Sequence, residues 1–316
     1  MRAAVIDVGS NSIKLLVADR APGGLREIVS TTLEVRIGTG IGSGKPSLTH
    51  EGMERGVAAI SRLVSDAKAQ GAERFMAVAT SAVRDASNGG VFREQVQAAT
   101  GLELRILTGI EEANGIGRGL TTDPALTSLR NFQVFDLGGG SLECLEFRDR
   151  QVGAAVSLPL GCVRLTEMFV NNPLEALTPA DLAQVTRHVA DTLTSSGFPL
   201  PAAPGTAFVG TGGTLTTARA ILAARSGLSL ADSDPKVAVG SLREMLALIG
   251  PIDVAFRRTI PGLPSSRADV FPTALATLVA RLGTDARRWA SSIPAPPPFR
   301  PDLDLIGYIE EGQKSP

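Results

Sequence analysis

The feature that most constrains this chain is a strand–turn–strand pattern that occurs twice. Residues 3–19 read AVIDVGSNSIKLLVADR and residues 133–150 read QVFDLGGGSLECLEFRDR. In both copies an apolar strand ends in an Asp, a Gly-rich turn with a Ser follows, and a second strand begins. The carboxylates of Asp7 and Asp136 are 129 residues apart (136 − 7 = 129). Each copy opens a run of three predicted strands followed by helices and strands, so the sequence predicts two similar α/β domains.

The length of 316 residues also favours two domains, because about 150 residues per domain is usual. We place the boundary in a turn-prone segment, which gives domains over 1–123 and 124–316. After residue 283 the Pro-rich stretch PAPPPFRP predicts an irregular tail. Apolar periodicity and breaker residues predict helices over 50–70, 89–100, 110–120, 162–170, 178–195, 213–225, 240–249 and 268–283.

Net charge, cysteine content and hydropathy limit the binding partners and the cellular location that we expect for this chain. The formal charge of −1 argues against a broad basic face for duplex nucleic acid or an anionic membrane. The two cysteines, Cys144 and Cys162, are too few for a disulfide scaffold and lack the paired spacing of a zinc site. The sequence shows neither a signal peptide nor a long uncharged apolar window, so we expect no membrane span and a cytoplasmic location.

The repeated turn has the chemistry of a phosphate-binding loop. Glycine lets the backbone approach an anion closely, so that successive N–H groups converge on phosphate oxygens. One such turn is usually only a hairpin, but two in the same strand context favour a site. The candidate phosphate-binding residues are Gly9, Ser10, Asn11 and Ser12 in the first loop, and Gly138, Gly139, Gly140 and Ser141 in the second.

The Asp before each loop would repel a bare phosphate, which points to a divalent cation such as Mg²⁺ between carboxylate and phosphate. Asp136 is the first candidate metal ligand and Asp7 the second. Lys14 holds the position in the first copy that Glu143 holds in the second, so the two loops differ chemically.

The duplicated Asp-x-Gly turn resembles the paired phosphate loops of the actin-like, sugar-kinase and heat-shock-chaperone ATPases. That resemblance implies an α/β fold of two ribonuclease-H-like domains facing a central cleft. Three further segments, ATSAVRDASN, LTGIEEANGIGRG and IPGLPSSRADVFP, join the two loops in a closer resemblance to the exopolyphosphatase and guanosine pentaphosphate phosphatase family, Ppx/GppA. It runs from residue 1 to about residue 283.

The family's pattern implies roles for single residues. The second Glu of the EEA segment is the catalytic base, which is Glu112 here. Glu143 matches the family's GGGS-x-E pattern and, with Asp136, is assigned to catalysis. Arg84 would hold a phosphate through its planar guanidinium.

Ordinary structural explanations remain open for these residues. Arg84 would otherwise be a surface Arg paired with Asp85, and Glu111 and Glu112 would follow the acidic preference of a first helical turn. Glu143 would be an exposed strand residue.

Other candidate residues have weaker sequence signals for a functional site. VGTGGTLT at 209–216 combines a strand, a Gly turn and a helix start, which suits an anion or ribose but equally suits close helix–strand packing. Arg267 precedes the last predicted helix and its role stays open. His50 and His188 have no metal-ligand spacing, so we expect surface or packing roles.

The resemblance implies an exopolyphosphatase that hydrolyses terminal phosphoanhydride bonds of inorganic polyphosphate and releases orthophosphate. A guanosine pentaphosphate 5′-phosphohydrolase is the nearest alternative. A kinase of the same fold and a non-catalytic polyphosphate- or nucleotide-binding protein are the others. The chain departs from the family after residue 283, where an LREG-like segment is replaced by LGTDARRWASS, and this puts closure of the second domain and contact with a partner subunit in a homodimer in doubt.

Overall fold

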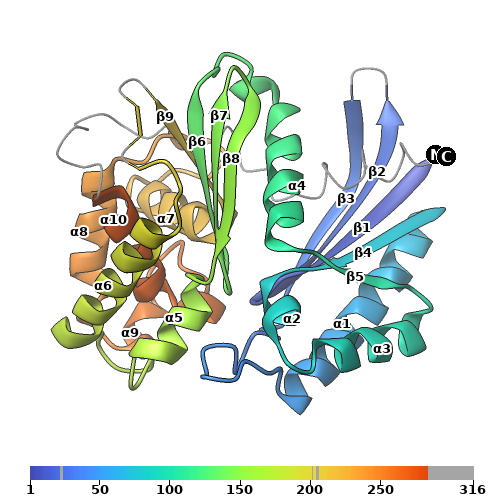
Figure 1. Cartoon of the computed structure of the whole chain (residues 1–316), viewed down its shortest axis with the longest axis horizontal. Coiled ribbons are helices and arrows are strands. Elements are labelled where there is room, and N and C mark those ends of the chain that lie inside the picture. The colour runs from blue at the N-terminus through green and yellow to red at the C-terminus, as the bar shows by residue number, and fades with distance from the viewer. Residues whose placement is uncertain (22–23, 201, 204–205, 284–316) are drawn as a thin grey trace. The chain divides into compact units, whose positions relative to one another are not determined.

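A computed structural model of the chain describes residues 1–21, 24–200, 202–203 and 206–283 (Figure 1). It divides into two compact units, of which the first is Met1–Thr127 and the second begins at Ser128. Each unit has its own sheet and helices, which confirms a two-domain α/β fold. The predicted limits of 1–123 and 124–316 place the break four residues earlier (127 − 123 = 4), and the predicted irregular tail lies outside the described residues.

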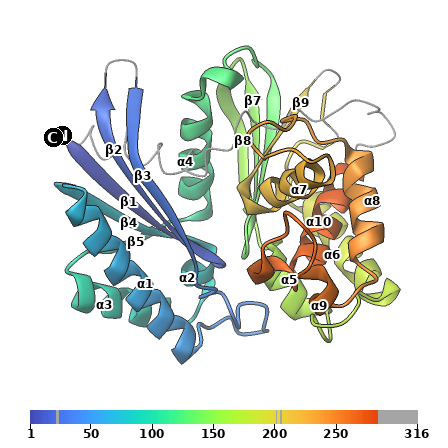
Figure 2. The same cartoon turned by 180° about the vertical axis from the view of Figure 1, so that it is seen from behind.

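The first unit is built on a sheet of order β3-β2-β1-β4-β5. β1 is antiparallel to β2 and parallel to β4, so it lies at the centre of the sheet and is buried along almost its whole length. α1 and α3 pack side by side on the sheet (Figures 1 and 2). The strands are β1 (Arg2–Val8), β2 (Ser12–Ala21), β3 (Gly24–Glu34), β4 (Arg74–Ala79) and β5 (Leu104–Ile106), and the helices are α1 (His50–Ala69), α2 (Ser81–Asp85), α3 (Gly89–Thr100) and α4 (Gly109–Thr121).

The second unit repeats this plan with the sheet order β8-β7-β6-β9. Among the described residues its sheet has four strands, whereas the first has five. α6 and α8 both pack against α10 (Figure 2). Its elements are β6 (Phe132–Leu137), β7 (Leu142–Arg148), β8 (Gln151–Leu158), α5 (Cys162–Phe169), α6 (Pro179–Ser195), β9 (Ala207–Thr211), α7 (Gly212–Arg225), α8 (Val239–Ile249), α9 (Val254–Arg257) and α10 (Phe271–Gly283).

The repeat extends to the register of the strands. Asp7 pairs with Lys14 across β1 and β2 in the first unit. Asp136 pairs with Glu143 across β6 and β7 in the second. Residues directly opposite each other in a sheet point to the same face, so each Asp has a charged neighbour beside it. The position equivalent to Lys14 is therefore Glu143, as the sequence predicts.

One helix start was predicted wrongly, and one short helix was not predicted. The helix predicted over 268–283 begins at Phe271, because the chain before it forms a 3₁₀ turn at Ser265–Arg267. α2 was not predicted, since five residues are too few to show an amphipathic period. Within the described residues no helix has the length and apolar character needed to cross a membrane.

Candidate active site

The first Gly-rich loop has its carbonyl groups tied to the segment that follows β3. The N–H of Gly9 donates to the carbonyl of Ser12 at 3.1 Å and closes the turn. The carbonyls of Ser10 and Asn11 accept from amides of segment 35–38 at 2.8–3.1 Å. The C=O and N–H groups of one peptide unit point in opposite directions, so the N–H of Asn11 is directed away from that segment. The chain after the third strand thus orients the loop.

The side chains of this loop are buried and polar. Ser10, Asn11 and Ser12 are each less than a tenth exposed. The Ser10 Oγ lies 3.3 Å from the Oγ of Ser81, the first residue of α2, and the Asn11 side-chain amide donates to the Glu34 carboxylate. Burial without such contacts would be costly, so these contacts fix the loop against α2 and β3.

Asp7 has a cation beside it inside the protein. The Nζ of Lys14 lies 3.8 Å from its Oδ2, and the Asp7 side chain is 8% exposed. The ammonium offsets part of the carboxylate charge that would otherwise attract a metal ion. Asp7 is therefore less suited than Asp136 to hold Mg²⁺.

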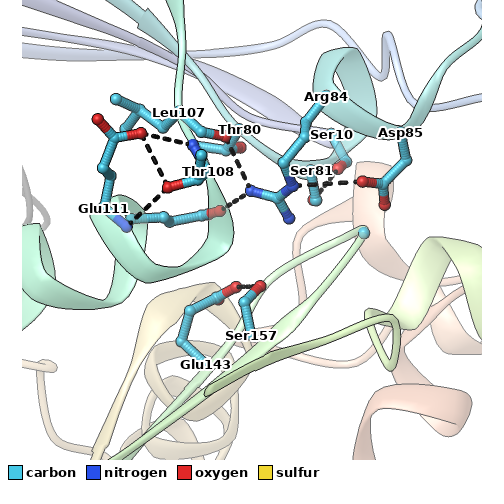
Figure 3. Close-up of polar contacts among 12 residues, drawn as sticks. Ser10, Thr80, Ser81, Arg84, Asp85, Leu107, Thr108, Glu111, Glu143 and Ser157 are labelled. Carbon is cyan, nitrogen blue, oxygen red and sulfur yellow. Dashed lines mark hydrogen bonds and ion pairs between the residues drawn. The ribbon is translucent and has the colours of Figure 1, made fainter. Parts of the chain in front are cut away.

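Arg84 joins the loop region to Glu112. Its Nη1 lies 2.6 Å from Glu112 Oε2. Nη1 also donates to the Leu107 carbonyl at 3.3 Å, and Nε donates to Asp85 at 3.2 Å (Figure 3). The predicted phosphate ligand and the predicted base are thus brought together, and the alternative pairing of Arg84 with Asp85 is present as well. The Glu112 side chain is only 10% exposed, so the ion pair fixes its orientation.

Glu111 has a structural contact set instead. It forms a capping box with Thr108, whose N–H and hydroxyl both donate to Glu111 Oε2 at 2.8 Å (Figure 3). The Thr108 amide and the guanidinium of Arg105 lower the pKa of Glu111 to about 2. Glu111 therefore stabilises the N-terminus of α4, and Glu112 lies on the buried side of the same turn.

The second loop is closed in the same way as the first. The N–H of Gly138 donates to the carbonyl of Ser141 at 3.0 Å. A Cβ placed on Gly161, the residue before α5, would lie 2.3 Å from the backbone of Gly139 and Gly140. The start of α5 therefore touches the loop directly, and only glycine fits at position 161.

Beside this loop, oxygen-bearing side chains form a row across four strands. Ser157, Glu143, Asp136 and Thr211 are successive cross-strand partners in the order β8-β7-β6-β9. The Ser157 hydroxyl donates to Glu143 Oε1 at 2.7 Å (Figure 3). A Cβ on Gly212 would lie 2.4 Å from Asp136 Oδ1, so only a glycine leaves space beside that carboxylate.

This row fits Mg²⁺. Two neighbouring carboxylates repel each other, and the buried Thr211 Oγ1 has no hydrogen-bond partner among the described residues. The described residues contain no cluster of three or more His, Cys, Asp or Glu able to enclose a metal. Mg²⁺ does not need one, because it is usually held by one or two carboxylates, substrate phosphates and water.

The remaining candidate residues have ordinary packing or surface contacts. Arg267 packs its guanidinium over Gly213, where a Cβ would lie 2.3 Å from Nη2. His50 is an exposed partner of Glu54 and His188 packs on Phe169, as expected of surface and packing residues. Burial raises the pKa of the Cys144 thiol to about 12, so it is an inert core residue.

Comparison with known proteins decides the family. The Ppx/GppA phosphatase family matches residues 16–283. The chain belongs to this family. Ppx/GppA members hydrolyse phosphoanhydride bonds, which confirms the predicted class of enzyme. An uncharacterized protein of Streptomyces coelicolor is 30% identical over 273 residues, which is 85% of this chain and 79% of that protein.

Solved Ppx/GppA structures share the fold. An exopolyphosphatase from Cytophaga hutchinsonii is 20% identical, with a TM-score of 0.86 over 99% of this chain and 98% of that one. The Aquifex aeolicus family member is 23% identical, with a TM-score of 0.76 over 100% and 99% of the two chains. At these identities the likeness establishes the Ppx/GppA fold.

Ser157 and Thr211 were not predicted from the sequence. Both follow from register, because they lie beside Glu143 and Asp136 on neighbouring strands. The register of β7 with β8 shifts at Glu146 and Phe147, so counting back from the turn does not identify Ser157. The Thr-x-x-Glu capping signature at Thr108, by contrast, is visible in the sequence.

Proposed function

We propose that this protein is an exopolyphosphatase that removes terminal orthophosphate from inorganic polyphosphate. The observation that carries the proposal is the partly buried ion pair between Arg84 and Glu112, at 2.6 Å. α2, which bears Arg84, also contacts the first loop through Ser81 and Ser10. A candidate phosphate-binding loop, a cation and a candidate base thus lie on neighbouring elements of one unit, and this supports the proposal.

These groups suit water attack on a phosphoanhydride. Loop N–H groups and Arg84 would bind the terminal phosphoryl group and spread the charge that develops on its oxygens. Substrate phosphate competes with Glu112 for Arg84, and loosening the ion pair frees a carboxylate oxygen. Glu112 would then orient the attacking water and accept its proton, a contribution of about 10²–10⁴-fold for a general base.

Asp136 and Glu143 would hold Mg²⁺ in the second unit, with Ser157 orienting Glu143 through its 2.7 Å hydrogen bond. When bound, the cation supplies positive charge next to the phosphate oxygens. In the first unit, the Lys14 ammonium takes the place of a second cation beside Asp7.

Guanosine pentaphosphate is the second candidate substrate, because it presents a terminal phosphoanhydride to the same groups. A cytoplasmic location accords with either substrate. It also accords with the two buried cysteines, Cys144 and Cys162, which form no disulfide among the described residues.

The test measures phosphate release from polyphosphate of defined lengths and from guanosine pentaphosphate, with and without Mg²⁺. We expect polyphosphate to be the faster substrate, Mg²⁺ to be required, and Glu112→Gln to lower kcat by about 10²–10⁴-fold. Glu111→Gln is the matched control, since Gln preserves the capping box and the change should leave kcat near that of the wild type.

Faster release from guanosine pentaphosphate would favour the second candidate. No release from either substrate would favour a binding protein. Release that is unaffected by Glu112→Gln would remove Glu112 as the base.

A further inference from the structure

The second loop has three successive carbonyl groups held by one neighbouring element. The carbonyl of Gly138 accepts from the N–H of Cys162 at 3.0 Å, and that of Gly139 accepts from the amides of Val163 and Arg164 at 2.8 and 3.1 Å. The carbonyl of Gly140 accepts from the Arg164 side chain, through Nε, at 2.9 Å. The N-terminal turn of α5 and one side chain therefore hold all three groups.

This arrangement sets the direction of the loop amides. In each peptide unit the N–H points opposite to the C=O. The N–H groups of Gly139, Gly140 and Ser141 are thus turned away from α5. Among the described residues these three N–H groups donate to no other group. Three parallel donors at a Gly-rich turn form an anion-binding concavity.

Arg164 is the only side chain in this set of contacts. It is 6% exposed, and it holds the one loop carbonyl that α5 does not reach with a backbone amide. In the first unit the corresponding support of the loop comes from backbone amides of segment 35–38. The two loops therefore differ: among the described residues, the last peptide of the second loop is held by a side chain and that of the first by backbone amides.

We propose that Arg164 is a positioning residue for phosphate binding. Its Nε–H keeps the Gly140 carbonyl turned toward α5, so that the N–H of Ser141 completes the row of donors, and its buried positive charge lies behind a loop that receives an anion. Arg164 itself contacts the loop and not the substrate. The inference deepens the proposed function and rests on it, since it assigns a phosphate to the second loop.

The control for this inference is Arg219. It is 4% exposed in the same unit, and its guanidinium also donates to backbone carbonyls, those of Leu230 and Ser233 at 2.8 and 3.2 Å. Arg219 lies on α7 and makes none of the contacts to the Gly138–Ser141 loop. Arg164→Gln and Arg219→Gln therefore remove equally buried cations, with only the first altering support of the loop.

The experiment titrates inorganic phosphate, with Mg²⁺, into the wild type, Arg164→Gln, Arg164→Lys and Arg219→Gln by calorimetry. Hydrogen exchange of the Gly139–Ser141 amides is followed in the same four proteins. We expect Arg164→Gln to weaken phosphate binding by about tenfold or more and to speed loop exchange. Arg164→Lys should fall between it and the wild type, because an ammonium group keeps the charge and one donor. Arg219→Gln should match the wild type in both readouts.

Wild-type affinity and wild-type loop exchange in Arg164→Gln would overturn the inference, as would equal losses in Arg219→Gln. If Arg164→Gln does not fold, Arg164→Lys becomes the test. Unchanged phosphate affinity in Arg164→Lys would then overturn the inference. Both readouts are independent of turnover. A wild-type protein that binds phosphate but hydrolyses nothing would therefore refute the proposed function and still decide the role of Arg164.

Discussion

Glu111 and Glu112 are adjacent in sequence, yet the helix gives them different partners. Successive helical residues point about 100° apart, so when Glu111 turns back to cap Thr108, Glu112 points to Arg84. An acidic pair in a first turn is common for reasons of helix stability alone. Here Glu111 supplies that stabilisation of the helix start, while Glu112 takes no part in the capping box.

The capping role of Glu111 predicts a pH-dependent effect on stability. Its pKa falls from an ordinary 4.5 to about 2 in the fold, so its ionised form contributes fully above pH 4.5 and is lost as the pH falls through 2. We expect Glu111→Ala to lower the free energy of unfolding by about 1 kcal/mol at pH 7. Because the side chain is 41% exposed, solvent screening limits the ionic part.

Denaturant unfolding at pH 7 and at pH 3 would measure the effect of Glu111→Ala, with Glu111→Gln as the control. The gap between wild type and Glu111→Ala should be smaller at pH 3. A gap that grows on acidification would mean that Glu111 does not stabilise the fold as a carboxylate.

Much of the site was predictable residue by residue from motif and strand position. Asp7, Asp136 and the loop residues lie where the repeated pattern puts them, and Lys14 and Glu143 are equivalent in register. The ion pair of Arg84 with Glu112 was not predicted, because α2 and α4 are separated by α3 and β5 and nothing local pairs them. Contacts of that kind depend on tertiary packing.

At the scale of elements, each loop is supported by the chain that follows the third strand of its meander. Segment 35–38 provides that support after β3 and the start of α5 provides it after β8. This explains why the repeat is three strands long and not two: the third strand returns the chain to the loop. A sequence pattern predicts the strands but not this hydrogen bonding, which depends on where each strand ends.

Gly161 is the position at which this support is most sensitive. Its φ of −66° is open to any residue, so the requirement for glycine is close approach, with a Cβ 2.3 Å from Gly139 and Gly140 backbone. We expect Gly161→Ala to displace the loop and to lower kcat/KM at least about tenfold. Steady-state phosphate release would measure it.

Gly240→Ala provides the comparison for that substitution. Gly240 is exposed on α8, and a Cβ there meets no atom within 4 Å. This change should leave kcat/KM unchanged and stabilise the protein by about 0.5–1 kcal/mol, since glycine is costly inside a helix. Wild-type kinetics in Gly161→Ala would show that the loop tolerates a shifted α5.

At the scale of the whole molecule, the two units share a three-strand meander with an Asp and a Gly-rich turn, but they differ in the charged residue beside that Asp. Both copies keep the central Asp, the Gly turn and the supported loop, while one Asp is paired with an ammonium group and the other with a carboxylate. A repeat in the sequence predicts two sheets, since each meander needs its own apolar cover. It does not predict their differences, such as the fifth strand found in the first sheet among the described residues.

The two cores predict how the protein unfolds. Leu63 on α1 is fully buried in the core of the first unit, and Leu242 on α8 is fully buried in that of the second. Replacing either by Ala should cost about 2–5 kcal/mol through lost burial and the cavity left behind. Because the two leucines belong to separate cores, each loss of stability should fall on its own unit.

Hydrogen exchange resolved by peptide should then show faster exchange in β1 and β4 for Leu63→Ala and in β6 and β9 for Leu242→Ala. Equal loss of protection in both sheets from either change would mean that the two units unfold as one cooperative body.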